Sequence, residues 1–513
     1  MKSSETHAAK AIVDRGRSYR TESQDAASQK AELPDPWPAP LAQGPLNATV
    51  VVPGSKSLSN RYLILAALGQ KPATISGLLR SRDTDLMAGA LRALGVGVKF
   101  DETDETRVTV TPPVNGRFKG NVTVFCGLAG TVMRFVPGLA LFADGPVRFD
   151  GDKQAYARPM HPLLDGLGQL GAHIEYHGEP GFLPFTITPP QSRRFEAQRN
   201  GEDPDAMNES GDPAIFQPAK VEIDSSSSSQ FISSLLLIGS RLPDGLDLKH
   251  TGSKLPSMPH ICMTMADVDG AGGKAEMPEI GHWQVAHREL QLPEGVVVEP
   301  DLSNAAPFLG AAMIAGGSVS VPNWPTSTTQ PGGLLPGILQ KMGATVTLEG
   351  RPFDDVMADV RGHQRAVPVP RNGTLKVSMD GPIRGLGKNF DMSAAGEIAP
   401  SIAALATLAD GPSELVGIGH LRGHETNRLA ALVTEITRIG AKAEELPDGL
   451  AITPVPNDEL HGEVMETYAD HRMATFAAMI GLAVANTRIR DIATTRKTIP
   501  DFPGMWSGML SQQ

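Results

Sequence analysis

Cysteine, aromatic residues, excess positive charge and long apolar runs are scarce or absent in this sequence, and each scarcity excludes a class of protein. The two cysteines, Cys126 and Cys262, lie far apart, so neither a disulfide framework nor a cysteine zinc site is expected, and a reducing cytoplasm fits. Aromatic residues make up 5% of the chain, which leaves few rings for stacking nucleic-acid bases. No apolar run approaches the ~18 residues of a membrane span. A net charge of -11 argues against a nucleic-acid or membrane partner.

Glycine and proline, by contrast, are abundant. The 54 glycines and 42 prolines predict many tight turns between helices of small residues, and the length of 513 residues predicts two or more domains. Two polar stretches have no apolar periodicity. We expect residues 1–35 to form a disordered N-terminal tail, and residues from about 191 to 220 to form a polar surface insertion between strands.

The clearest pattern is an internal repeat that occurs six times. In each copy a polar turn precedes a helix rich in Ala and Leu, which is followed by a Gly and a short β-type run. One position marks each copy: Ser57, Thr131, Ser229, Ser303, Glu397 and His471. Successive markers are 74, 98, 74, 94 and 74 residues apart, and three equal intervals are hard to obtain by chance.

A second helix follows several of these markers and ends at a glycine, as at Gly95, Gly171, Gly343 and Gly440, which is typical of a helix C-cap. The repeated unit therefore contains two helices and several strands. Six units are most simply arranged as three in each of two lobes. Ordinary α/β proteins also alternate helices and strands, so the repeat alone leaves that alternative open.

The polar residues of the repeat point to a function. Each marker is expected at a helix N-terminus, where free N–H groups and the helix dipole favour anions. Basic side chains share these turns: Lys56, Arg61, Arg134, His471 and Arg472. If the helices of both lobes point at one cleft, positive potential would gather there despite the net negative charge. The expected ligands are therefore small polyanions.

Six sequence blocks resemble the signature blocks of the 5-enolpyruvylshikimate-3-phosphate synthase family. They are ProGlySerLysSerLeuSerAsnArg (53–61), LeuAlaGlyThrValMetArg (128–134), SerSerGlnPhe (228–231), ArgGlyHisGluThrAsnArgLeu (422–429), AspHisArgMet (470–473) and ThrArgLysThrIleProAspPhe (495–502). The resemblance covers residues from about 40 to 502, with the blocks in order. It implies transfer of the enolpyruvyl group of phosphoenolpyruvate to the 5-hydroxyl of shikimate 3-phosphate, with release of phosphate through a tetrahedral intermediate, in the shikimate pathway to chorismate and the aromatic amino acids.

The same resemblance implies an α/β fold: a two-lobed inside-out α/β barrel of six repeated βαβαββ-type units, three per lobe. Residues 36–55 and 297–513 would form the first lobe, and residues 56–296 the second. The family works without a metal or other cofactor, and its members are usually monomers. A cytoplasmic monomer with two small-molecule substrates, and with no nucleic-acid or membrane partner, is therefore expected.

The blocks also imply which residues bind the two substrates. Shikimate 3-phosphate would contact Lys56, Ser57, Arg61, Ser228, Ser229, Gln230, Ser257, Glu397 and His424. Phosphoenolpyruvate would contact Lys56, Gly130, Arg158, Gln230, Arg428, Arg472 and Lys497. Because Gly130 has no Cβ, its pocket is also expected to admit glyphosate, a phosphonate slightly longer than phosphoenolpyruvate.

By the same resemblance, Glu397, Glu425 and Lys56 carry the proton chemistry. Glu397 would act on the side of the 5-hydroxyl, and Glu425 with Lys56 on the side of the methylene carbon and the leaving group. Burial among cations lowers the pKa of a carboxyl and apolar walls raise it, and the sequence leaves open which effect is larger.

The chain departs from the family pattern at a few positions. Leu128 replaces an Asn, His424 a Lys, Asn427 an Asp and His260 a Tyr, and all of these except Leu128 keep a hydrogen-bond donor. These departures bear on the contacts to shikimate 3-phosphate rather than on the fold or the reaction.

Two alternatives share the repeat. The sister enzyme that transfers enolpyruvate to UDP-N-acetylglucosamine usually has a reactive Cys five residues before its ArgPro pair, where this chain has Lys153. A non-catalytic anion-binding repeat protein would be expected to lack Glu397 and Glu425, both of which are present.

Overall fold

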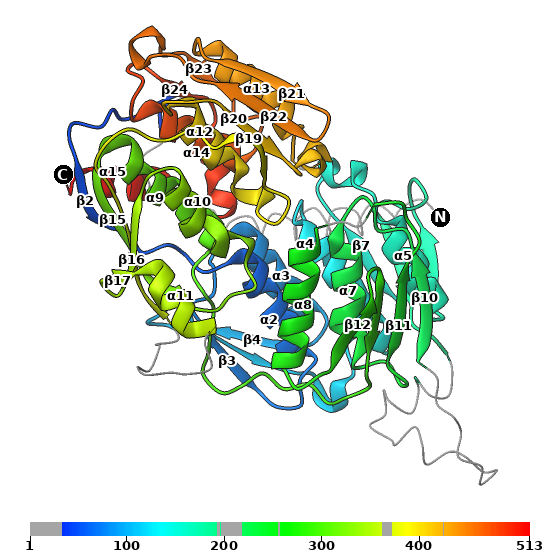
Figure 1. Ribbon diagram of the computed structural model, residues 1–513. Helices are drawn as coiled ribbons and strands as arrows, with labels where there is room; N and C mark the ends of the chain where they lie inside the picture. Colours follow the sequence, from blue (N-terminus) through cyan, green and yellow to red (C-terminus); the bar gives the residue numbers. More distant parts are fainter. Residues whose placement is uncertain are drawn as a thin grey trace.

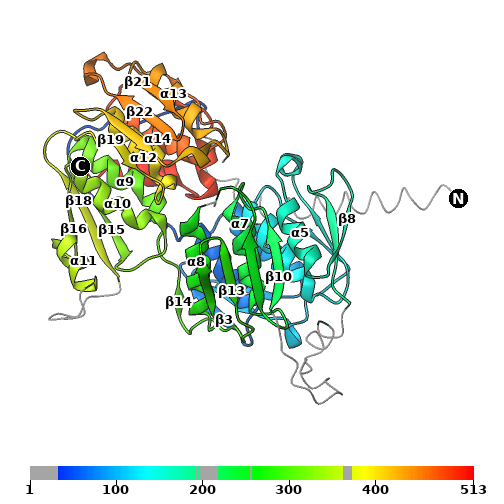
Figure 2. The same cartoon turned by 45° about the vertical axis from the view of Figure 1, so that its right-hand side comes forward.

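The computed structural model describes residues 33–191, 195, 218–254, 257–361, 372–423 and 425–512. These residues form two lobes, each with its own buried apolar core (Figures 1 and 2). The core of the second lobe uses residues between Leu58 and Val298. The core of the first lobe combines residues from both sides of that segment, because the chain crosses between the lobes twice.

The two crossing segments are hydrogen-bonded to each other. Ser55 N–H donates to the carbonyl of Glu299 at 2.8 Å, and Asp301 N–H donates to the carbonyl of Pro53 at 2.8 Å. The connection between the lobes is therefore a paired double strand of chain rather than a single linker.

Three four-stranded sheets with one shared topology build the second lobe. In each sheet the first two strands are parallel and the remaining pairs are antiparallel. Their orders are β14 (Val296–Val297), β3 (Ala73–Ser76), β5 (Val108–Thr111), β4 (Gly97–Phe100); β6 (Val122–Phe125), β7 (Val147–Asp150), β9 (Phe185–Thr188), β8 (His173–Tyr176); and β10 (Ala219–Ile223), β11 (Leu246–His250), β13 (His282–Val285), β12 (Ala275–Glu279).

The first lobe repeats this plan with variations in strand number. Its sheets are β17 (Arg351–Pro352), β16 (Thr345–Leu348), β18 (Asn372–Met379), β15 (Gly317–Pro325), β2 (Leu46–Thr49); β19 (Gly387–Asp391), β20 (Ser413–Val416), β22 (Gly449–Thr453), β21 (Lys442–Leu446); and the small β1 (Trp37–Pro38), β24 (Arg488–Ile489), β23 (Val464–Met465). The six sheets correspond to the six predicted repeats.

Each sheet is accompanied by a pair of helices. In the second lobe these are α2 (Lys56–Ala67), α3 (Arg82–Ala93), α4 (Gly130–Phe135), α5 (His161–Gln169), α7 (Ser229–Gly239) and α8 (Met258–Gly270). In the first lobe they are α9 (Leu302–Ala315), α10 (Leu335–Lys341), α12 (Ala399–Thr407), α13 (Arg428–Arg438), α14 (His471–Gly481) and α15 (Phe502–Leu510), with α11 (Phe353–Arg361) as an addition. The order β6, α4, β7, α5, β8, β9 confirms the predicted βαβαββ unit.

Two units are completed by strands from distant parts of the chain. Strand β2 pairs with β15 in the first lobe before the chain crosses, and β14 pairs with β3 in the second lobe before the chain returns. Each crossing therefore takes place inside a repeat, between its first strand and its first helix.

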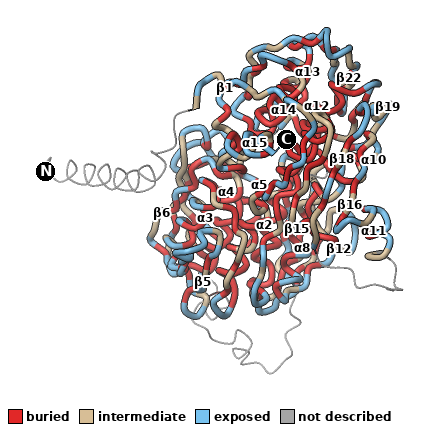
Figure 3. The backbone as a smooth tube through the Cα atoms, turned by 90° about the vertical axis from the view of Figure 1, so that its left-hand side faces the viewer, coloured by how far each residue is buried: buried red, intermediate tan, exposed pale blue. Residues whose placement is uncertain are grey.

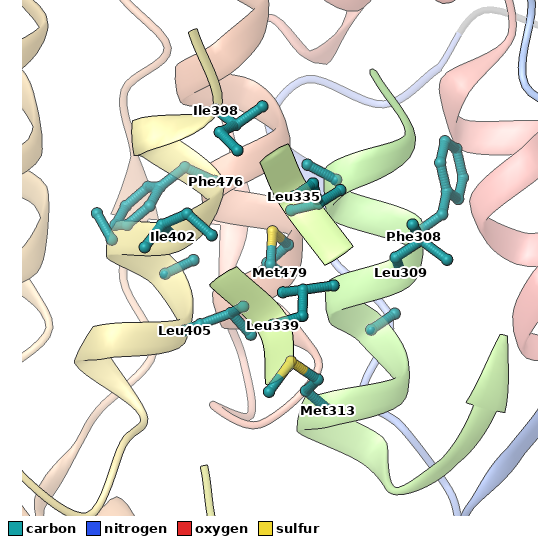
Figure 4. Close-up of a cluster of buried hydrophobic side chains, with 14 of the residues drawn as sticks. Phe308, Leu309, Met313, Leu335, Leu339, Ile398, Ile402, Leu405, Phe476 and Met479 are labelled. Atoms are coloured by element: carbon teal, nitrogen blue, oxygen red, sulfur yellow. The ribbon is translucent and has the colours of Figure 1, made fainter. Parts of the chain in front are cut away.

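The helices that follow the markers are apolar on nearly all sides and lie inside the lobes. Helices α9, α12 and α14 are almost wholly buried, as expected for stretches dominated by Ala, Leu, Ile and Met. In the first lobe they meet around Leu309, Leu405 and Met479 (Figure 4). Figure 3 shows the buried backbone in red through α12 and α14. Such helices reach solvent only at their ends. Their polar N-terminal turns are therefore where substrates can be bound.

The two predicted polar stretches lie mostly outside the described residues. Of the tail, Leu33 packs on the first core and Asp35 accepts a hydrogen bond from Asp491 N–H at 2.8 Å. The predicted insertion, at about residues 191–220, follows β9 in the sequence and overlaps the first residues of β10. Its described residue Phe195 is buried, with its ring centroid 6.2 Å from that of Phe142, so the stretch contributes at least one side chain to the core.

Candidate active site

The six marker residues all lie in the first turn of a helix, as the repeat predicts. Ser57, Thr131, Ser229, Ser303 and His471 lie in the first turns of α2, α4, α7, α9 and α14, and Glu397 lies in the 3-10 turn η6 (Gly396–Ile398) that leads into α12. The turn that holds Glu397, in the first lobe, faces the first turn of α8 in the second lobe, because Glu397 is hydrogen-bonded to His260. The candidate site lies where these turns meet.

Lys56 begins α2 directly after the second lobe is entered. Ser55 caps the helix by accepting from Leu58 N–H at 3.4 Å, and the backbone N–H of Lys56 donates to Asp301 Oδ2 at 3.5 Å. The Lys56 ammonium is 3.6 Å from Asp83 Oδ2 and keeps part of its surface exposed. Lys56 is therefore an oriented cation that an incoming anion can reach.

Arg61, one turn further along α2, is buried beneath the site. Its guanidinium donates to Thr264 Oγ1 at 2.9 Å, to the Ser57 carbonyl at 3.0 Å and to the His260 carbonyl at 3.1 Å. Burial lowers its pKa to about 10, although nearby Asp267 opposes the shift. In this geometry Arg61 supports the turns that form the site, and direct contact with a substrate stays a prediction.

Gly130 faces two arginines. A Cβ on Gly130 would lie 2.8 Å from Arg158 Nη2 and 3.1 Å from Arg134 Nη1. Arg158 is held by a bond to the Leu128 carbonyl at 2.9 Å, and Arg134 donates to Gln230 Oε1 at 2.9 Å. Burial lowers the pKa of Arg134 to about 9, and the charge of Arg158 adds to this. Two guanidiniums that lie this close would be stabilised by an anion between them.

The serine turn before α7 has the geometry of a helix cap. Ser228 accepts from Gln230 N–H at 3.3 Å, and Ser229 is the first helical residue. The predicted reading of these serines as an N-cap turn is therefore confirmed. Ser257, at the N-cap of α8, has no side-chain capping bond within the described residues.

Glu425 is surrounded by cations. It forms ion pairs with Lys497 and, at 2.9 Å, with Arg428. Burial alone would raise the pKa of Glu425, but the charges of Lys497, Arg428 and Lys56 hold it well below its usual range. The question that the sequence left open is thus answered for this carboxyl: the cations outweigh the burial.

Asp470 holds the guanidinium of Arg428 in place. Its Nε donates to Asp470 Oδ2 at 2.7 Å, and Asp470 Oδ1 accepts from Arg472 N–H at 2.8 Å as the cap of α14. Tyr468 and Ala469, directly before, both have φ of 54°, a left-handed conformation that costs energy for residues with a side chain. The hydroxyl of Tyr468 donates to Glu435 Oε1 at 2.7 Å, which holds this turn in place.

Glu397 receives donors on both carboxylate oxygens. His260 Nε2 lies 2.7 Å from Oε1, while Ser303 Oγ donates to Oε2 at 3.3 Å and Arg472 Nη2 is 3.7 Å from the same oxygen. The two predicted proton-transfer carboxylates therefore lie in one network, linked by Arg472, Asp470 and Arg428.

Sequence reasoning missed several supporting residues. Asp83, Asp470 and the pairing of His260 with Glu397 were not predicted as parts of the site, and Arg134 was noticed only as a basic residue of its turn. The AspHisArg block could have suggested Asp470, because an Asp before a helix start is a common cap. His424 lies outside the described residues. His471 is buried, and burial together with Arg472 lowers its pKa well below the usual value, which favours a neutral structural role.

The described part of the chain holds no group of three or more His, Cys, Asp or Glu side chains that could bind a metal ion. Over the same ranges, no helix combines the length and the apolar character needed to cross a membrane.

Comparisons with known proteins extend over nearly the whole chain. Residues 41–201 and 207–506 match the family model of EPSP synthase (3-phosphoshikimate 1-carboxyvinyltransferase). A 3-phosphoshikimate 1-carboxyvinyltransferase from Bifidobacterium longum is 64% identical over 477 residues, which cover 93% of this chain and 98% of that protein.

Two solved structures share the fold at low identity. An EPSP synthase from Acinetobacter baumannii gives a TM-score of 0.69 at 20% identity and covers 91% of this chain and 97% of its own. The enolpyruvyl transferase NikO from Streptomyces tendae gives a TM-score of 0.60 at 16% identity and covers 91% and 96%. These likenesses confirm the predicted two-lobed inside-out α/β architecture.

Proposed function

This chain belongs to the EPSP synthase family and catalyses enolpyruvyl transfer in the shikimate pathway, and on that premise we propose how its side chains act on phosphoenolpyruvate and shikimate 3-phosphate. The observation that carries the proposal is the single network that joins Glu397 and Glu425 to the cations Arg428, Arg472 and Lys497. A transfer between two anionic substrates that is coupled to proton transfer requires acid–base groups to move the protons and cations to bind the substrates. The two carboxylates and the cations of this network supply both.

Phosphoenolpyruvate is proposed to lie between the lobes. Its phosphate and carboxylate would be held by Lys56 and Arg158 from the second lobe and by Arg428, Arg472 and Lys497 from the first, with Gly130 and Gln230 as the wall. Guanidinium groups bind carboxylate and phosphate in a bidentate manner, which fixes the reacting carbon.

Shikimate 3-phosphate is proposed to lie on the second lobe. Its phosphate would accept hydrogen bonds from Ser228, Ser229 and Ser257, at the N-termini of α7 and α8, where free N–H groups and the helix dipole favour an anion. Lys56, Ser57, Arg61, Gln230, Glu397 and His424 would complete the site.

The reaction has two stages, and each stage removes one proton and adds another. In the first stage Glu397 takes the proton of the 5-hydroxyl as the hydroxyl oxygen bonds to C2 of phosphoenolpyruvate, while C3 gains a proton and becomes a methyl group. In the second stage Glu425 takes a proton from C3, the C2–O bond to phosphate breaks, and the leaving phosphate gains a proton on the side of Lys56, which yields the enolpyruvyl ether and free phosphate.

Glu425 is ionised in the network described here, so it must gain a proton before it can donate one to C3. The negative charges of phosphoenolpyruvate would engage Lys497 and Arg428 and weaken their hold on the carboxylate. Substrate binding thereby raises the proton affinity of Glu425 at the step where a proton is needed.

The remaining organisation is proposed on the same basis. The two core clusters support a first lobe of residues 36–55 and 297–513 and a second of residues 56–296, although Val298 packs in the second core and Leu33 on the first. The tail and the monomeric state stay predictions. The cytoplasm stays the predicted location.

An assay of phosphate release tests the function. Phosphoenolpyruvate with shikimate 3-phosphate should release phosphate, whereas phosphoenolpyruvate with UDP-N-acetylglucosamine should not. The second acceptor is disfavoured because Lys153, in the turn η3 (Lys153–Ala157), occupies the position of that enzyme's reactive Cys. Release only with the sugar nucleotide would replace the proposed function with its alternative.

A further inference from the structure

A histidine of the second lobe reaches across to a carboxylate of the first. His260 Nε2 lies 2.7 Å from Glu397 Oε1, and both side chains are largely shielded from solvent, at 16% and 30% exposure. The two residues are 137 positions apart in the chain, so only the docking of the lobes brings them together.

The backbone of His260 is anchored in the second lobe. Its carbonyl accepts hydrogen bonds from Thr264 Oγ1 at 2.9 Å and from the buried guanidinium of Arg61 at 3.1 Å. These hydrogen bonds fix the first turn of α8, and that turn sets the position of the imidazole.

A hydrogen bond from His260 completes the set of donors around Glu397. Ser303 and Arg472, from α9 and α14, face Oε2, whereas Oε1 receives His260 from the opposite lobe. A carboxylate that accepts hydrogen bonds on both oxygens is favoured in its ionised form and is restricted in orientation. Both properties are needed in a base that removes a hydroxyl proton.

Several other charged or titratable groups act on Glu397 from the elements around it. They are Arg61 of α2, Asp301 at the cap of α9, His420 of the turn η7 (Gly419–Gly423), Arg428 of α13 and Arg472 of α14. Burial lowers the pKa of His420, and His260 contributes to this lowering.

We propose that His260 is a positioning residue for Glu397, which holds that carboxylate ionised and aimed at the acceptor hydroxyl through a hydrogen bond formed between the lobes. The inference rests on the proposed role of Glu397 as the base. The hydrogen bond on Oε1 favours the ionised carboxylate, so loss of this donor should move the acidic limb of the activity profile to higher pH.

Two substitutions separate the contribution of the donor from that of the side chain's bulk. His260→Gln keeps a nitrogen donor near the position of Nε2, and His260→Phe fills the space but removes the donor. The profile of kcat against pH, measured by phosphate release from pH 5 to 9, is the readout, with thermal unfolding as a check that both variants fold.

We expect His260→Phe to lower kcat at neutral pH by about 10-fold, with a smaller change in KM for either substrate. The acidic limb of the profile should move to higher pH by about one unit in His260→Phe and by less in His260→Gln, which should recover most of kcat above pH 8. His282→Gln is the matched control, because His282 Nε2 pairs with Asp247 at 2.9 Å on the sheet of β11 and β13, outside the site. Its profile should equal that of the wild type.

The outcomes distinguish this inference from the function on which it rests. An active wild type, with the acidic limb of His260→Phe at the same pH as that of the wild type, would overturn the inference and leave the proposed function standing. A wild type that releases no phosphate with shikimate 3-phosphate would overturn both.

Discussion

At the scale of single residues, Glu425 is the clearest case of a side chain whose chemistry is set by its neighbours. Partial removal from water raises the pKa of a carboxyl, yet Lys497 and Arg428 keep Glu425, whose side chain is 28% exposed, in its ionised form. Burial lowers the pKa of Lys497, and the charge of Lys56 adds to this, while Glu425 opposes it. Each member of the group therefore depends on the others, and one substitution will disturb more than one charge.

Replacing Glu425 by Gln should lower kcat by at least ~10²-fold, the usual scale for one acid–base group, while KM changes much less. Steady-state phosphate release measures both. Glu445→Gln is the control, since Glu445 forms a comparable ion pair with Arg422 at 3.0 Å on the surface and should leave turnover unchanged. Near-normal turnover in Glu425→Gln would remove this residue from the mechanism.

Gly130→Ala should raise the inhibition constant of glyphosate far more than KM for phosphoenolpyruvate. The added Cβ would come within 2.8 Å of Arg158 Nη2 and 3.1 Å of Arg134 Nη1, so these groups must shift, and the longer ligand loses room first. Inhibition at matched phosphoenolpyruvate compares the two proteins.

The control for that experiment is Gly89→Ala, in α3, where an added Cβ meets no atom within 4 Å. It should keep the wild-type response to glyphosate. Equal sensitivity of Gly130→Ala and the wild type would show that Gly130 does not line the pocket.

At the scale of elements, helices α2 and α8 meet through a buried pair of opposite charges. Arg61 Nε lies 3.9 Å from Asp267 Oδ2, too far for a hydrogen bond, and the guanidinium is instead hydrogen-bonded to Thr264 and to backbone carbonyls. Burial raises the pKa of Asp267 to about 7, although Arg61 opposes the shift. The pair is therefore a place where the packing of two helices responds to pH.

The sign of this response follows from proton binding. Between about pH 4 and 7 the folded protein holds a proton on Asp267 that the unfolded chain has released, so the stability contributed by this group falls as pH rises through that window. Asp267→Asn removes the titration and should show a flatter dependence of Tm on pH from 4.5 to 7.5. Asp355→Asn, an exposed carboxyl in the first turn of α11, should keep the wild-type slope. A wild-type slope in Asp267→Asn would contradict the assignment.

At the scale of the whole molecule, like charges from the two lobes face one another across the site. Lys56 belongs to the second lobe and Lys497 to the first, the charge of Lys56 acts on Lys497, and the lobes have separate cores. In the absence of a bound anion this repulsion favours separation of the lobes, and an anion that bridges the cations removes it.

Saturating shikimate 3-phosphate together with glyphosate should therefore reduce the radius of gyration measured by solution X-ray scattering. We expect the lobes to rotate about the two paired crossing segments, because each lobe has its own core. An unchanged radius at saturating ligand would show that the lobes do not close.

The sequence by itself determined the features that depend on local spacing. The six markers, at intervals that repeat 74 residues, predicted six helix starts, and the glycines at 95, 171, 343 and 440 end helices with φ of 85°, 92°, 105° and 99°. Ser228 and Ser229 could be placed at a helix cap because the apolar run that follows them is adjacent. Helix periodicity and capping act over a few residues, so a linear pattern records them.

Only the tertiary structure decided which distant groups meet. It paired β2 with β15 and β14 with β3, although the strands of each pair are far apart in the chain. It also buried Arg61, brought Asp470 into contact with Arg428 and brought His260 to Glu397. It also decided that cations outweigh burial at Glu425. These outcomes depend on how the six helix pairs pack and on the distances between charges that this packing fixes, and no local spacing in the chain encodes such distances.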